Sequence, residues 1–176
     1  MRNLYYFIVS IALLSGCKGK VSDFQEKKHL PSHVYRYIDA DTAKLTYLET
    51  DYVPVYSDIY HQDGTRKFLL TATVSVRNTS PADSAIILSV TYFDSYGKRL
   101  KEYVGKPLVL SPLESIEFVV EEEENLGGAG ANFIVSWGAT NYSDQLLIQS
   151  VMIGSYGQQG ISFLSESRMI KRSFKK

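Results

Sequence analysis

Short segments in which apolar and polar residues alternate recur along most of this chain. Every second residue is apolar in residues 70–77, LTATVSVR, and the same holds for residues 86–92 and 116–121. A period of two is typical of β-strands that bury one face. Residues 78–81, Asn-Thr-Ser-Pro, supply turn-forming side chains after the first of these segments. Residues 147–153 are more apolar on both faces and therefore predict a central strand.

The pattern predicts about eight or nine short strands separated by turns, and no long helix. We therefore expect an all-β fold, an antiparallel β-sandwich of immunoglobulin-like architecture, with a small barrel as the alternative. The sandwich is expected to span residues 51–170. Before it, residues 34–50 could form a short helix or an edge strand. After it, residues 171–176 (KRSFKK) are expected to form a frayed basic tail.

The N-terminal residues have the features of a secretory signal. A basic start at residues 1–3 precedes eleven uncharged residues, LYYFIVSIALL, which are too few for a comfortable membrane span. Leu14-Ser15-Gly16-Cys17 then resembles the lipobox of bacterial lipoproteins. The resemblance implies that residues 1–16 are a lipoprotein signal peptide and that the thiol of Cys17 carries a diacylglyceryl group.

Lipidation of Cys17 would fix the location of the protein. Residues 17–50 would then be a lipid-anchored tether, and residues 18–33 are polar without a sustained apolar period. We expect the protein at the bacterial cell membrane or outer membrane, facing the periplasm or the exterior. The alternative is a soluble secreted protein in which the cysteine is incidental.

Composition excludes several classes of protein. The chain has 19 Lys and Arg against 19 Asp and Glu, and this neutral balance argues against a dedicated nucleic-acid binder. A hydrophobic content of 44% is too high for a disordered chain. The single cysteine rules out an internal disulfide framework and a Cys-rich zinc site. No cofactor is expected.

Four segments together resemble a known family. They are residues 52–60 (YVPVYSDIY), 70–80 (LTATVSVRNTS), 127–139 (GGAGANFIVSWGA) and 151–170 (VMIGSYGQQGISFLSESRMI). The set is similar to an uncharacterised bacterial lipoprotein family catalogued as domain of unknown function 3124, over roughly residues 50–170. The resemblance implies a lipoprotein and the extent of the domain, and it brings no activity, substrate or catalytic residue.

No segment has a convincing catalytic or metal-binding pattern. Ser57 and His61 lie close along the chain, but a catalytic triad is a spatial arrangement with an oxyanion hole. His29 and His33 have the spacing of ligands on a helix, and a proline between them argues against one. The glutamates at residues 121–124 would alternate between two faces if the strand continued through them. We predict no catalytic residue and no metal ligand.

Residues 154–160, GSYGQQG, form the most interesting loop. Three glycines among Tyr156, Gln158 and Gln159 give an adaptable polar surface with one aromatic ring, a composition that suits recognition. Arg168 follows soon after and could contact a carboxylate or phosphate. We predict partner binding at these four side chains. The alternative is a hairpin turn chosen for backbone freedom, followed by an arginine in an ordinary surface ion pair.

These observations favour a lipid-anchored binding or assembly module of the cell envelope that does not catalyse a reaction. Its expected partners are membrane lipid, through acylated Cys17, and an envelope protein. The alternative function is that of a small periplasmic ligand-binding protein or a hydrolase that uses the region from Ser57 to His61.

Overall fold

The elements of the described chain are all β-strands. The computed structural model describes residues 35–39, 41, 44–122, 124, 126–141 and 146–174. All of them fall within one unit of the chain, residues 34–176. The predicted signal peptide at residues 1–16, the predicted lipidation site Cys17 and the predicted tether at residues 18–33 lie outside the described residues.

The described residues form twelve strands, which exceeds the eight or nine that the sequence pattern predicts. The strands are β1 (Tyr47–Pro54), β2 (Asp58–His61), β3 (Asp63–Leu69), β4 (Thr71–Asn78), β5 (Ala85–Phe93), β6 (Arg99–Val104), β7 (Leu108–Leu110), β8 (Ser115–Val120), β9 (Asn132–Ala139), β10 (Leu146–Tyr156), β11 (Gln159–Glu166) and β12 (Arg168–Phe174). The predicted all-β class is confirmed.

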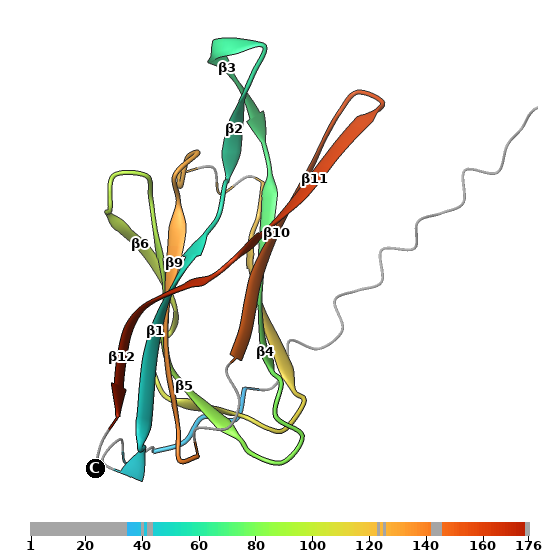
Figure 1. The fold of residues 1–176 in the computed structure, drawn as a ribbon. Coiled ribbons are helices and arrows are strands. Elements are labelled where there is room, and N and C mark those ends of the chain that lie inside the picture. Colours follow the sequence, from blue (N-terminus) through green and yellow to red (C-terminus); the bar gives the residue numbers. More distant parts are fainter. Residues whose placement is uncertain are drawn as a thin grey trace, which may run out of the picture. The chain divides into compact units, whose positions relative to one another are not determined.

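Two antiparallel sheets and one hairpin make up the fold (Figure 1). The first sheet has six strands in the order β12-β1-β9-β5-β6, with β7 also paired to β5. The second sheet has four strands in the order β11-β10-β4-β8, so β10 is central, as predicted from its apolar sequence. Strands β2 and β3 pair only with each other. The sheets are open, which excludes the closed-barrel alternative.

The buried faces of the two sheets share one hydrophobic core, as in a β-sandwich. Strand β4 shows how the alternation produces it, because Ala72, Val74 and Val76 point inward and are fully buried. From the other sheet, Phe133 and Trp137 of β9 are buried in the same cluster. Side chains that alternate in sequence therefore meet between the sheets.

The inward face of β5 differs from the expectation. The sequence predicts that Ile86 and Leu88 share a buried face with Val90 and Tyr92. In the structure Ile87 is fully buried, and Ile86 and Leu88 are only partly buried. The pairing of β5 with β9 shifts register between residues 87 and 89. Such a bulge exchanges the two faces of a strand, and a period of two cannot reveal its position.

Both ends of the predicted sandwich domain extend further than residues 51–170. Strand β1 starts at Tyr47, so the short element allowed within residues 34–50 is neither a helix nor an edge strand there, because β1 lies between β9 and β12. The frayed tail expected at residues 171–176 is also wrong for residues 171–174, which belong to β12. The Tyr47 and Phe174 rings lie 5.3 Å apart between centroids, and this contact helps to hold β12 against β1.

Candidate functional site

Two hairpins lie beside each other at one end of the sandwich (Figure 1). The first is β2–β3, which turns at Gln62 with a positive φ of 63°. The second is β10–β11, which turns at Gly157 with a positive φ of 61°. These segments are two separate candidates in the sequence, and the fold brings them together.

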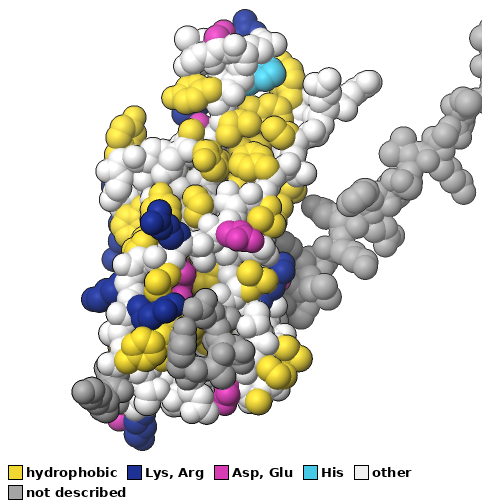
Figure 2. All heavy atoms as spheres, viewed as in Figure 1, with side chains coloured by type: hydrophobic (Ala, Val, Ile, Leu, Met, Phe, Trp, Pro, Cys, Tyr) yellow, Lys and Arg dark blue, Asp and Glu magenta, His cyan; other side chains and the backbone are white. Residues whose placement is uncertain are grey.

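Aromatic side chains fill the contact between the two hairpins. The ring of His61 lies 6.2 Å from Phe68 and 6.0 Å from Tyr156, and Phe68 lies 6.3 Å from Tyr156. Next to them, Tyr56 and Phe163 meet edge to face at 5.6 Å. We call these five residues the aromatic end. Figure 2 shows hydrophobic side chains gathered around the histidine on this part of the surface.

The aromatic end is accessible to a partner. Tyr156 is 72% exposed and His61 is exposed, whereas Phe68 and Phe163 are partly buried beneath them. The turn residue Gln158 and its neighbour Gln159 are exposed at the tip of the same hairpin. An exposed aromatic ring above a packed aromatic base, with amides beside it, has the composition of a protein-binding surface.

Ser57, Asp58 and His61 do not act on one another in the described structure. Ser57 is buried, and its Oγ accepts a hydrogen bond from the Gly128 amide at 2.7 Å. Asp58 is buried and binds the Lys67 Nζ at 2.8 Å. His61 instead contacts the aromatic rings of Phe68 and Tyr156. The three side chains therefore have three different sets of partners.

Arg168 lies apart from the other predicted partner-binding residues. It belongs to β12 and pairs with Tyr52 of β1 in the six-stranded sheet. Tyr156, Gln158 and Gln159 lie at the turn of a hairpin in the four-stranded sheet. The structure thus brings together three of the four side chains and places Arg168 on another sheet.

Sequence reasoning missed a buried acidic pair on β1. Glu49 and Asp51 occupy inward positions of the strand and are 6% and 4% exposed. Asp51 accepts a hydrogen bond from the Trp137 indole at 2.9 Å, and Glu49 binds the Arg172 guanidinium at 3.2 Å. Tyr47 also donates to Glu49. The available signal was that the alternation in residues 47–53, YLETDYV, places both carboxylates in phase with Tyr47 and Val53.

Burial dominates the protonation of this pair. Burial, and then the negative charge of Asp51, raise the pKa of Glu49, while Arg172 acts in the opposite direction. Burial also raises the pKa of Asp51, against the hydrogen bonds from Trp137 and Ser167. Asp51 is hydrogen-bonded to β9 and Glu49 to β12, so the pair stabilises the packing of both strands against β1.

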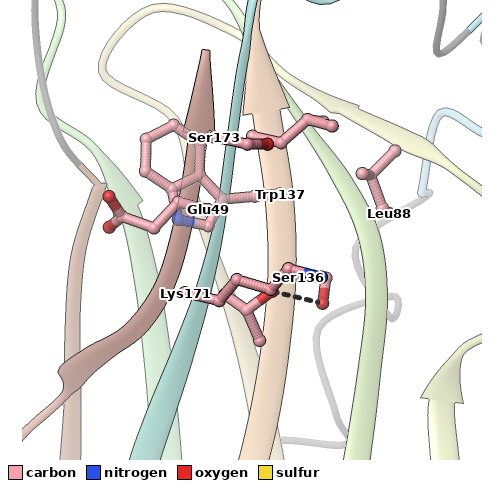
Figure 3. A pocket seen from close by; sticks show the side chains of 8 residues that line it. Glu49, Leu88, Ser136, Trp137, Lys171 and Ser173 are labelled. Atoms are coloured by element: carbon pink, nitrogen blue, oxygen red, sulfur yellow. Dashed lines mark hydrogen bonds between the residues drawn. The ribbon is translucent and has the colours of Figure 1, made fainter. Parts of the chain in front are cut away.

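A small hollow lies over β1, β5, β9 and β12 of the six-stranded sheet (Figure 3). Leucines, hydroxyl side chains and a lysine contribute to its lining, among them Leu48, Leu88, Thr50, Ser136, Ser173 and Lys171. The Thr50 and Ser136 hydroxyls bind each other at 3.2 Å. This bond already engages two of the polar groups, so the aromatic end is the stronger candidate.

The described residues contain neither a cluster of metal-binding side chains nor a membrane-spanning helix. In that part of the chain, three or more histidine, cysteine or acidic side chains nowhere gather in a geometry that could hold a metal ion. It also contains no helix with the length and apolarity needed to cross a membrane.

The fold and this surface define an antiparallel β-sandwich with an aromatic, two-hairpin surface at one end. The chain belongs to the family described as "Protein of unknown function (DUF3124)", which matches residues 48–170. No curated protein matches the chain. A solved structure described as the crystal structure of Thermotoga maritima 1070 is similar, with 12% sequence identity and a TM-score of 0.41. The match covers 68% of this chain and 92% of that chain.

Proposed function

We propose that this chain is a lipid-anchored protein of the bacterial cell envelope that binds a protein partner through the aromatic end, without catalysis. The single observation that carries the proposal is the contact of two hairpins through His61, Phe68 and Tyr156. Tyr156 is 72% exposed above this contact, so its ring is accessible to a partner.

The chemistry of this end favours a protein over a small ligand. The exposed ring of Tyr156 offers a large apolar area with a hydroxyl at its edge, and Gln158 and Gln159 add donors and acceptors. Small ligands are usually enclosed by a concave pocket. The hollow of Figure 3 lies over another surface, that of the six-stranded sheet. The partner we propose is therefore an envelope protein with an exposed apolar patch.

The competing function is hydrolysis through the region from Ser57 to His61. The buried Ser57 hydroxyl bonded to Gly128, and the ion pair of Asp58 with Lys67, favour binding over this alternative. A nucleophilic serine needs an adjacent base and access to substrate. His61, the only histidine of the region, has its ring against Phe68 and Tyr156.

A photo-crosslinking amino acid at position 156 tests the proposal in native membranes. We expect one discrete crosslinked protein, identified by mass spectrometry. The matched control carries the crosslinker at Leu113, which is 68% exposed between β7 and β8, and should give no such product. Absence of a product at position 156, or the same product from both positions, would overturn the proposal.

A further inference from the structure

Strand β11 is an edge strand, and among the described residues no strand pairs with its outer side. In the described part of the chain it pairs only with β10, through eight consecutive residue pairs from Gln149–Glu166 to Tyr156–Gln159. The backbone groups on its other side are therefore available for a further strand. Figure 1 shows the hairpin of β10 and β11 projecting from the rest of the sandwich.

Charged side chains on the edge strands β12, β6 and β8 give a protection that β11 lacks. Strand β12 carries Arg168, Lys171 and Arg172, β6 carries both signs of charge in its sequence RLKEYV, and β8 carries Glu117 at its centre. Charged side chains on edge strands discourage pairing with other chains. The sequence of β11, QGISFLSE, has a single charge, at its last residue.

Both faces of β11 also present apolar side chains. On one face Leu164 is 51% exposed, and the register aligns it with Val151 of β10, Thr73 of β4 and Val119 of β8. On the other face Ile161 is 39% exposed. A strand added here would therefore meet apolar neighbours on both of its faces, so it should itself be uncharged and apolar on both faces.

We propose that β11 pairs with β11 of a second copy of this chain, so that the two four-stranded sheets join into one. The strand that this edge requires is neutral along its centre with apolar residues on both faces, and β11 itself has that sequence. Antiparallel pairing of a strand with its own copy satisfies two-fold symmetry. This inference concerns the backbone edge of β11, which shares Phe163 with the aromatic end, and it does not depend on the proposed function.

Electrostatics allow this pairing at β11 and oppose it at β12. With the symmetry axis beside Phe163, Glu166 of one copy faces Gly160 of the second copy, so no like charges meet. The same operation on β12, centred on Lys171, would set two lysines against each other. Like charges directly opposite across strands are destabilising.

Two differently tagged full-length copies, co-expressed and isolated from membranes in mild detergent, test the pairing. We expect each tag to recover the other copy, and recovery to fall at least tenfold in Leu164→Lys. The matched control is Val119→Lys, in the same transverse row but on the opposite edge and 42% exposed, which should retain recovery. Equal recovery in both variants, or none in the wild type, would overturn the inference.

Cysteine scanning provides a second measurement that needs no lysine substitution. Each residue from 160 to 165 is replaced by cysteine in turn, and an oxidant is added to intact membranes. We expect a disulfide-linked dimer that peaks near the symmetry axis and is absent for Ser84→Cys, an exposed loop position. Failure of all six positions, or linkage to a different protein, would show that this edge does not bind a second copy.

Discussion

At the scale of single residues, a missing side chain decides how closely the two hairpins of the aromatic end approach each other. A Cβ atom at Gly154 would lie 2.5 Å from the Phe68 ring, 2.7 Å from the Leu69 carbonyl oxygen and 2.8 Å from Leu70. Real Cβ atoms do not lie so close to other atoms. The Leu69 carbonyl oxygen belongs to the backbone, so it cannot rotate away as a side chain can. Only glycine therefore allows β10 to pack against the end of β3.

Replacing Gly154 by alanine should separate the two hairpins. We expect the variant to lose about 1–3 kcal/mol of unfolding free energy, the usual cost of overpacking, as measured by urea denaturation. The matched control is Gly160→Ala on the neighbouring strand, where the nearest atom to a new Cβ is 3.8 Å away. Equal stability of the two variants would contradict this account of the contact.

At the scale of elements, the attachment of β12 to β1 depends on buried carboxylates as well as on the contact between the Tyr47 and Phe174 rings. Arg172 binds Glu49 at 3.2 Å, and Ser167, just before β12, donates to Asp51 at 3.3 Å. Burying these acids has a free-energy cost that the hydrogen bonds offset only in part, since the pKa of both groups is raised. The stability of this strand pair should therefore depend on pH.

The direction of that dependence follows from the raised pKa of Asp51. The folded chain holds the proton more tightly than the unfolded chain, so this contribution is present below the ordinary pKa of about 4 and is lost as the pH rises through the raised pKa. We expect the unfolding free energy of the wild type, relative to Asp51→Asn, to fall as the pH rises from about 4 towards neutrality. Thermal unfolding across this range measures the difference. A difference that stays constant or grows would refute the assignment.

Strands β4, β1 and β12 show where reasoning from the sequence succeeds and where it fails. Strand β4 was predictable because its inward residues Ala72, Val74 and Val76 are apolar, whereas the inward positions of β1 include Glu49 and Asp51. Residues 171–174 of β12, KRSF, have the sequence of a frayed basic tail, and the strand with which they pair lies more than 100 residues earlier. The sequence indicates the two hairpins of the aromatic end only separately, because no local pattern shows that His61 contacts Tyr156.

At the scale of the whole molecule, the proposed function requires that the sandwich be held near a membrane. The lipobox-like residues Leu14 to Cys17 support this requirement, because acylation of the cysteine would place lipid chains at the start of the mature chain. A single acyl chain gives only marginal binding, whereas two or more give stable anchoring. Retention in the membrane should therefore depend on Cys17 and on neither hairpin.

Cys17→Ala should move the full chain from the membrane pellet to the soluble fraction, or leave an uncleaved precursor. The matched control Ser15→Ala keeps a small residue before the cysteine. This variant should remain in the membrane pellet and, when the membranes are extracted by detergent phase separation, in the detergent phase. Immunoblotting of the fractions, with mass spectrometry of the N-terminal peptide, separates these outcomes. A fully processed Cys17→Ala protein that stays in the pellet after a high-salt wash would rule out the lipid anchor. The crosslink at position 156 would then have to be explained by a protein partner that itself holds the sandwich at the membrane.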